Sequence, residues 1–227
     1  MRLVLVRHGQ SVWNLENIFT GWSDVDLSHQ GRKEASESGR KLLEAGIDFD
    51  VVYTSYLKRA IHTATIIMDE MNRNWLPLIK AWQLNERHYG ALQGLNKAQT
   101  AEQYGDDQVK LWRRSYTTLP PLLEPGDNRD PHNLPMYRDV DPSLLPMGES
   151  LAITVKRVLP YFNSEIKRDM LNGQRVLVVA HGNSLRALLK ELEEYSDDDI
   201  ISLEIPTGSP LVLEFDDDFS VLRSFYL

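Results

Sequence analysis

The sequence lacks cysteine, long apolar runs and any excess of basic residues. The absence of cysteine excludes disulfides, thiolate metal sites and a cysteine nucleophile. The mostly apolar start, residues 1–6, stops at Arg7 and is too short for a signal peptide. No apolar stretch approaches the roughly 18 residues that a membrane span needs. We therefore expect a soluble, cytoplasmic protein with no membrane partner.

Charge is distributed unevenly along the chain. There are 25 lysines and arginines against 33 acidic residues, a formal net charge of −8. Eleven of the acidic residues lie between Glu191 and Asp218, where there is no lysine or arginine, so the rest of the chain carries +3. That remainder is compatible with an anion-binding pocket, and the acidic stretch is interpreted as a solvated face. The absence of a basic stripe gives no support for a nucleic-acid partner.

Short apolar runs rich in β-branched residues predict strands that are buried on both faces, as in a parallel sheet covered by helices. Such runs occupy residues 4–6 and 176–180. Residues 49–53 show the same pattern, and residues 78–82 show it more weakly.

Helical patterns lie between these runs. Ser28 and Ser55 are predicted N-caps of the first two helices, a third begins near Ser150 and is expected to kink at Pro160, and residues 184–192 form a short fourth. Strands that alternate with helices predict an α/β fold. The expected architecture is a three-layer sandwich with a mostly parallel central sheet flanked by helices.

One segment interrupts this alternation. Seven of the eleven prolines lie between Pro120 and Pro146, which predicts irregular structure, and the preceding residues 96–116 have a polar helical pattern. We interpret residues 1–227 as one domain with a cap-like insertion at about residues 90–148. Long segments of this kind are often lids or binding loops.

Two segments share one plan: an apolar strand, a histidine followed by a glycine, and a stretch able to form a helix. They are residues 3–11 and 178–184, with His8 and His181 at the strand ends. Ligands of open α/β sheets bind beyond the carboxyl ends of strands, and each glycine lets the backbone approach a ligand or adopt positive φ. Imidazole can attack phosphorus, and the guanidinium of Arg7 grips phosphate. The pattern predicts a phosphoryl-transfer site.

Other charged side chains follow predicted strands or lie in the insertion. Arg59 follows the second strand, Glu86 begins a segment that combines an acid, a base and a phenol, and Arg113 and Arg114 follow a tryptophan. Each has a structural alternative: a solvated arginine, a satisfied turn, and the polar face of a cap helix, respectively.

In their order along the chain, these motifs resemble those of the cofactor-dependent phosphoglycerate mutases of the histidine phosphatase superfamily. The Arg-His-Gly motif alone identifies only the superfamily, whereas the Glu-Arg-His-Tyr-Gly and Trp-Arg-Arg blocks are typical of the mutase branch. The matching segments cover nearly the whole chain: residues 7–14, 19–28, 54–63, 84–97, 112–114, 180–186 and 205–208.

The resemblance implies a role for each matching residue. His8 is the nucleophile that carries the phosphoryl group, His181 stabilises charge on that group, and Glu86 is the general acid and base. The group being moved is surrounded by Arg7, Asn14, Arg59, Gly182 and Asn183, with Ser11 as a further substrate-binding residue. The carboxylate and the other phosphate of the three-carbon substrate are held by Thr20, Gly21, Arg87, Tyr89, Lys97, Arg113 and Arg114.

The family interconverts 3-phosphoglycerate and 2-phosphoglycerate through phosphohistidine and 2,3-bisphosphoglycerate, which is also the priming cofactor, and needs no metal. Its members form dimers and tetramers, so the resemblance implies a homo-oligomer. Three alternatives remain at this point. They are a histidine-type phosphatase that acts on small phosphorylated metabolites, a bisphosphoglycerate mutase, and a non-catalytic binder of phosphorylated ligands.

Overall fold

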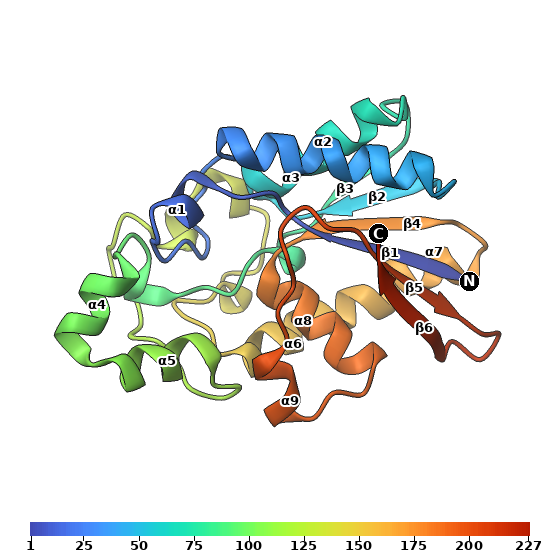
Figure 1. The fold of residues 1–227 in the computed structure, drawn as a ribbon. Helices are drawn as coiled ribbons and strands as arrows, with labels where there is room; N and C mark the ends of the chain where they lie inside the picture. The colour runs from blue at the N-terminus through green and yellow to red at the C-terminus, as the bar shows by residue number, and fades with distance from the viewer.

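Six strands form one central sheet in the computed structural model, which describes residues 1–227. The strand order is β3-β2-β4-β1-β5-β6 (Figure 1). Strands β3, β2, β4 and β1 pair in parallel, whereas β5 is antiparallel to β1 and β6 is antiparallel to β5. The predicted mostly parallel sheet is confirmed. The strands are β1 Arg2–Arg7, β2 Val51–Thr54, β3 Leu78–Lys80, β4 Val176–Ala180, β5 Leu211–Phe215 and β6 Val221–Tyr226.

Helices cover both faces of the sheet, which confirms the predicted three-layer sandwich. Figure 1 shows α2 and α3 on one face and α6, α7 and α8 on the other. None of the helices has the length and apolarity required to cross a lipid bilayer. The helices are α1 Val12–Leu15, α2 His29–Glu44, α3 Lys58–Glu70, α4 Lys97–Tyr104, α5 Asp106–Arg114, α6 Leu151–Tyr161, α7 Lys167–Leu171, α8 Gly182–Leu192 and α9 Asp197–Ser202.

Strand β1 connects the two apolar cores because successive side chains of a strand point to opposite faces. Leu3 and Leu5 pack into the core formed with α6 and α8. Val4 and Val6 pack into the core formed with α2 and α3. All four side chains are at most 2% exposed, so the end of β1 is held rigidly from both sides.

The predicted helix starts are right at Ser28 and Ser150 and wrong at Ser55. Ser28 and Ser150 occupy the N-cap positions of α2 and α6, and each side chain accepts a hydrogen bond from the first helical turn. Helix α3 instead begins after Leu57, which has no side-chain cap. Helix α6 continues past Pro160 into the π-helical turn Phe162–Ile166, so this proline does not end the helix.

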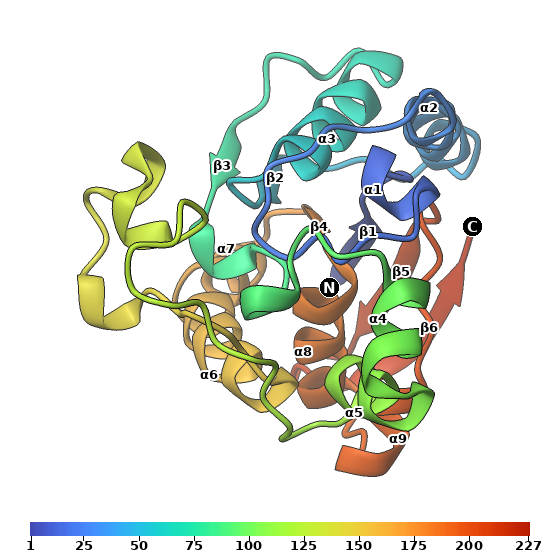
Figure 2. The ribbon, with the colours of Figure 1, turned by 90° about the vertical axis from the view of Figure 1, so that its left-hand side faces the viewer.

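The segment expected to be an insertion lies beside the carboxyl ends of the parallel strands. Figure 2 looks towards these ends and shows α4 and α5 next to them. A single residue, Gly105, separates the two helices and has φ of +86°, which favours glycine. Residues 115–150 contain no α-helix or strand and only three short 3-10 turns, as the concentration of prolines predicts.

Candidate active site

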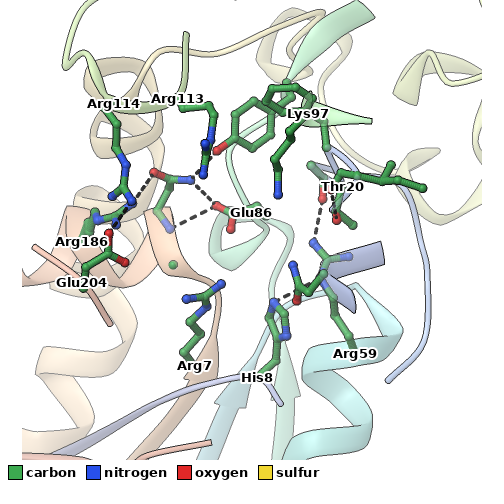
Figure 3. A pocket seen from close by; sticks show the side chains of 17 residues that line it. Arg7, His8, Thr20, Arg59, Glu86, Lys97, Arg113, Arg114, Arg186 and Glu204 are labelled. Atoms are coloured by element: carbon green, nitrogen blue, oxygen red, sulfur yellow. Dashed lines mark hydrogen bonds and ion pairs between the residues drawn. The ribbon is translucent and has the colours of Figure 1, made fainter. Parts of the chain in front are cut away.

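A small polar cavity lies where the carboxyl ends of β1 and β4 meet the insertion (Figure 3). Its volume is about 160 Å³, which suits a small metabolite and excludes a polymer. It is lined by Arg7, His8, Asn14, Ile18, Phe19, Thr20, Gly21, Arg59, Glu86, Tyr89, Lys97, Arg113, Arg114, Gly182, Asn183, Arg186 and Glu204.

The cavity is strongly positive although the protein is acidic. Six of its lining side chains are lysine or arginine and two are glutamate. A concave site with one dominant sign of charge concentrates ligands of the opposite sign. The arrangement therefore fits a ligand with several negative charges, as the uneven charge distribution of the sequence predicts.

His8 lies at the end of β1 and is 2% exposed. Its Nδ1 is 2.7 Å from the carbonyl oxygen of Gly9, which can only accept, so Nδ1 carries the proton and Nε2 keeps its lone pair. Burial, with the charges of Arg59 and Arg7, holds the pKa of His8 well below its usual value. The ring is therefore neutral at neutral pH, with a nucleophilic nitrogen.

His181 follows β4, and its ring centre lies 4.9 Å from that of His8. Its Nε2 is 2.7 Å from the Oγ of Ser55, while Nδ1 is buried without a hydrogen-bond partner. Burial, followed by the charge of Arg59, lowers the pKa of His181 well below its usual value. The two histidines predicted from the repeated strand–His–Gly plan thus form one pair.

Two arginines flank His8 in fixed positions. Arg59 is 1% exposed, and its guanidinium donates to the carbonyls of Gly21 at 2.7 Å and Ser23 at 3.0 Å. Its Nε lies 3.3 Å from Nε2 of His8. Burial lowers the pKa of Arg59 to about 10, so it stays charged at neutral pH. Arg7 donates to the carbonyl of Ile205 at 2.7 Å and keeps a buried Nε without a partner.

Glu86 projects into the cavity opposite this arginine pair (Figure 3). Its Oε1 accepts hydrogen bonds from the backbone of Arg87 at 2.8 Å and from the backbone and side chain of Asn183 at 3.1 and 2.9 Å. Its Oε2 makes no hydrogen bond within the protein, which leaves that oxygen for a ligand. The first turn of α8 therefore orients this carboxylate through Asn183.

A buried ion pair holds the turn that carries Glu86. The guanidinium of Arg157 binds both carboxylate oxygens of Glu149 at 2.7 and 2.8 Å. It also donates to the carbonyls of Gln83, Asn85 and Glu86. The side chains of this pair are 9% and 1% exposed. The backbone of Glu86 is consequently fixed from beneath by a desolvated network.

The insertion supplies the remaining positive charge. Lys97, at the start of α4, and Arg113, in the last turn of α5, line the cavity without any hydrogen bond within the protein. Burial lowers the pKa of Lys97. Arg114, the last residue of α5, forms an ion pair with Glu204. These groups are thus less constrained than the arginines beside His8.

Two predicted substrate-binding residues do not line the cavity. Ser11 is fully buried and caps α1, with its Oγ accepting from the backbone of Asn14 at 3.1 Å. Arg87 is 1% exposed, donates to the carbonyl of Trp112 and lies over the ring of Tyr89 at 4.4 Å. Burial alone raises the pKa of Tyr89, but the charge of Arg87 helps to lower it overall. His181, predicted as catalytic, is fully buried against His8 and does not itself line the cavity. The other predicted site residues all line it.

Three polar or charged residues at this site were not predicted from the sequence. Arg186 lines the cavity one helical turn beyond Asn183 and donates to its Oδ1 at 3.2 Å. The spacing of three residues on a predicted helix was the available signal. Ser55 contacts His181 rather than capping a helix. Glu204 belongs to the acidic stretch interpreted as a solvated face, yet it lies in the cavity wall.

Packing requires a glycine after only one of the two histidines, because a Cβ on Gly182 would make ordinary contacts at 3.7 Å or more. Neither Gly9 nor Gly182 has positive φ. A Cβ on Gly9 would lie 2.1 Å from the carbonyl oxygen of Gly31, so only glycine lets this loop reach the start of α2. No group of three or more histidine, aspartate or glutamate side chains has an arrangement suited to a metal ion.

The fold resembles those of solved phosphatases. A mycobacterial glucosyl-3-phosphoglycerate phosphatase complexed with VO3 superposes with a TM-score of 0.74 at 24% identity, over 99% of this chain and 96% of that one. An alpha-ribazole phosphatase from Shigella flexneri has a TM-score of 0.72 at 21% identity, over 100% and 96%. At these identities the likeness shows the fold alone.

Sequence comparison is more specific. Residues 3–130 and 127–227 match the model of the histidine phosphatase superfamily (branch 1). A 2,3-bisphosphoglycerate-dependent phosphoglycerate mutase of Treponema denticola is 60% identical, with 100% of this chain and 92% of that protein covered. One of the same name from Lachnoclostridium phytofermentans is 57% identical, with 100% and 91% covered. The chain therefore belongs to the histidine phosphatase superfamily, branch 1.

Proposed function

We propose that the chain is a 2,3-bisphosphoglycerate-dependent phosphoglycerate mutase, an isomerase that interconverts 3-phosphoglycerate and 2-phosphoglycerate. Full-length relatives of that name are 57% and 60% identical to it. The observation that carries the proposal is the neutral, Nδ1-protonated His8 within a cavity lined by six cationic side chains. This combination of nucleophile and fixed positive charge is what transfer of a phosphoryl group requires.

His8 supplies the attacking atom in this proposal. Its Nδ1–H is held by Gly9, so the lone pair of Nε2 is free to form a bond to phosphorus. As that bond forms, the bond between phosphorus and the substrate oxygen breaks, and its electron pair stays on the oxygen. In the reverse step a substrate hydroxyl oxygen takes the phosphoryl group, and Nε2 regains its lone pair. A carbonyl-anchored ring keeps its geometry in both directions.

Arg7, Arg59 and His181 stabilise the moving group. The negative charge on its oxygens must be balanced by donors that are in place before reaction. Nε of Arg59 lies 3.3 Å from the attacking nitrogen, Arg7 lines the same cavity with a buried Nε that has no partner, and the ring of His181 lies 4.9 Å from that of His8. Unpaired buried donors are costly in an empty site and become satisfied when a phosphoryl group binds.

Glu86 is proposed to move the proton. The substrate oxygen that loses phosphorus needs a proton, and the hydroxyl that accepts phosphorus must release one. Asn183 holds Oε1, which leaves Oε2 to face the substrate oxygen. Glu86 then gives its proton in one half-reaction and regains it in the other, so that the enzyme returns to its starting state.

The residues present fit 2,3-bisphosphoglycerate as the priming cofactor. A ligand with a carboxylate and two phosphates matches a cavity lined by six cationic side chains, and the buried Nε of Arg7 there has no partner. When bound, this molecule supplies the phosphoryl group that primes His8. Arg7 and Arg59 would hold the phosphate beside His8, and Lys97, Arg113 and Arg114 would hold the far end of the molecule.

We also propose a metal-independent reaction, a cytoplasmic location and a homo-oligomer of two or four chains. Strand β3 is an edge of the sheet, with Ile79 exposed on it and Trp75 beside it 76% exposed. An exposed strand edge with apolar neighbours favours pairing with a second copy. The molar mass in solution, measured by light scattering, tests this part: a monomer at micromolar concentration contradicts it.

A coupled assay of 3-phosphoglycerate conversion, with a strong chelator present, tests the function. We expect turnover that requires or is strongly stimulated by 2,3-bisphosphoglycerate, survives the chelator and is inhibited by vanadate, which adopts the five-coordinate geometry of the moving group. Activity lost on chelation and restored by manganese contradicts the proposal. Hydrolysis of phosphoglycerates without isomerisation identifies a phosphatase instead.

A further inference from the structure

Three consecutive residues after α9 hold three different arginines of the cavity. The carbonyl of Leu203 accepts from Nε of Arg186 at 2.8 Å, and the carbonyl of Ile205 accepts from Arg7 at 2.7 Å. Between them, the side chain of Glu204 pairs with Arg114. Two of these contacts use backbone oxygens and do not depend on the side chain at that position. The middle contact alone depends on a charged side chain.

The middle contact also differs in exposure. The side chains of Arg114 and Glu204 are 31% and 67% exposed, whereas Arg186 is 9% exposed as a residue. The guanidinium of Arg114 makes no other hydrogen bond within the protein, so this pair alone fixes its position. An ion pair with this exposure is weak and readily exchanged. Arg114 is therefore the arginine of the three that can change partner at the lowest cost in free energy.

Glu204 is an unexpected residue for the wall of an anion site. Its carboxylate occupies donors of Arg114, one of the six cations that line the cavity. Burial alone raises the pKa of Glu204, but the hydrogen bond from Arg114 lowers it overall, so the group is charged at neutral pH. A carboxylate kept charged in this position weakens anion binding.

We propose that Glu204 competes with the ligand for Arg114. Arg114 pairs with Glu204 when the cavity is empty and with the far anionic end of the ligand when it is filled. The exchange tethers the end of α5 to the body of the protein between turnovers and limits how tightly products bind. This inference rests on the proposed function only in the choice of phosphoglycerate as the ligand.

Calorimetric titration of the unprimed enzyme with 3-phosphoglycerate tests the exchange, because no phosphoryl group is available for turnover. Glu204→Gln keeps the shape of the side chain and removes its charge. We expect it to bind 3-phosphoglycerate about three- to fivefold more tightly than the parent. Arg114→Gln binds 3-phosphoglycerate more weakly than the parent. The double variant binds it with an affinity within twofold of that of Arg114→Gln, because no Arg114 guanidinium remains for Glu204 to take from the ligand.

Glu214→Gln is the matched control. Glu214 is also paired with arginines, but it lies on β5 and does not line the cavity. It changes the net charge by the same amount, and we expect unchanged binding. Circular dichroism of each variant shows whether it is folded.

Two results overturn the inference. Unchanged or weaker binding by Glu204→Gln means that the pair only positions Arg114 for the ligand. Equal tightening in the presence and absence of Arg114 means simple repulsion without exchange. If the parent does not bind 3-phosphoglycerate, that result contradicts the proposed function. The exchange is then tested by the same titrations with inorganic sulfate as the ligand.

Discussion

The cavity has two walls that differ in how firmly their charged side chains are held. The strand-end wall is formed by Arg7, His8 and Arg59, and the buried His181 packs against His8. Each of these four side chains has at least one hydrogen bond within the protein. The insertion wall is formed by Lys97, Arg113 and Arg114. Its side chains have no hydrogen-bond or ion-pair partner except Glu204, which pairs with Arg114.

The difference matches two tasks in the proposed reaction. Charge develops at the moving phosphoryl group, and donors that are already fixed stabilise it without reorganisation. A mutase must also retain a ligand while its two phosphates exchange places, and side chains free to follow either end suit that task. In the proposed reaction the strand-end wall would serve transfer of the phosphoryl group, and the insertion wall would serve retention of the ligand.

The largest effect is expected on the strand-end wall. His8→Ala removes the attacking nitrogen, so mutase turnover should fall by about 10⁴-fold or more, and no phosphoenzyme should form. Incubation with 2,3-bisphosphoglycerate followed by acid and alkali treatment checks this, because a phosphoramidate is stable in alkali and lost in acid. His62→Ala, at a partly buried histidine that pairs with Asp26 outside the cavity, is the control. Labelling of His8→Ala equal to that of the parent contradicts the assignment.

The next largest effect is expected when the buried ion pair between Arg157 and Glu149, which holds the turn that carries Glu86, is broken. Arg157→Met leaves Glu149 buried and unpaired, which should lower the free energy of unfolding by about 3–5 kcal/mol. The backbone carbonyl of Glu86 also loses its hydrogen bond from Arg157. In the enzyme that remains folded, kcat should therefore decrease by a larger factor than KM increases. Urea denaturation and steady-state kinetics measure the two effects. Arg73→Met, which breaks a partly exposed pair with Asp48, should cost less than about 1 kcal/mol. Equal losses in the two variants would show that burial is unimportant here.

The insertion wall can be weakened without touching the strand ends. Arg113→Ala/Arg114→Ala removes two charge-assisted contacts of roughly 1.5–3 kcal/mol each. We expect mutase turnover to fall by about 100-fold and phosphatase turnover by less than tenfold. Lys110→Ala, an exposed residue on the same helix, should change neither rate. Equal loss of both activities would remove the distinction between the walls.

A further difference is expected in the pH dependence of stability. His8, His88 and His181 are buried with lowered pKa values, about 3 for His88, so they bind protons only in the unfolded state as pH falls below about 6.5. Stability should therefore decrease from pH 7 to pH 5, by up to about 1.4 kcal/mol per pH unit for each histidine.

The titration of His132, in the insertion, changes the stability in the opposite direction as pH falls. Its hydrogen bond to Asp130 raises its pKa, so its contribution is present below the unfolded pKa and is lost as pH rises through the folded one. Urea midpoints at pH 5 and 7 should show a smaller decrease for His88→Gln than for the parent, and a slightly larger one for His132→Gln. The reverse order contradicts the assigned shifts.

The parts of the fold that follow from local sequence pattern were predictable. Strands β1 and β4 are uninterrupted apolar runs, and His8 and His181 were placed together because parallel strands end at one edge of the sheet. Ser55 was misassigned because a serine before a helical pattern has the same signature whether it caps a helix or bonds a distant histidine. The position of α5 beside the site could not be predicted, because residues 115–150, which connect α5 to α6, are irregular and have no periodic pattern.

Glu204 shows a different limit of sequence reasoning. Composition averaged over residues 191–218 correctly indicates an acidic surface, yet a single member of that stretch lies in the cavity wall. Only the tertiary contact with Arg114 distinguishes it from its neighbours. An acidic residue in such a stretch is predicted to be solvated, and only its ion-pair partner in the folded protein shows whether it belongs to a site.

Partition of a labelled phosphoryl group tests the division of labour between the walls most directly. Enzyme labelled at His8 from 2,3-bisphosphoglycerate is mixed with excess 3-phosphoglycerate, and the label is followed over a single turnover. We expect the parent to deliver label to phosphoglycerates and Arg113→Ala/Arg114→Ala to label normally but release most of it as inorganic phosphate. An unchanged partition in the variant, or failure of the variant to label, would contradict the account.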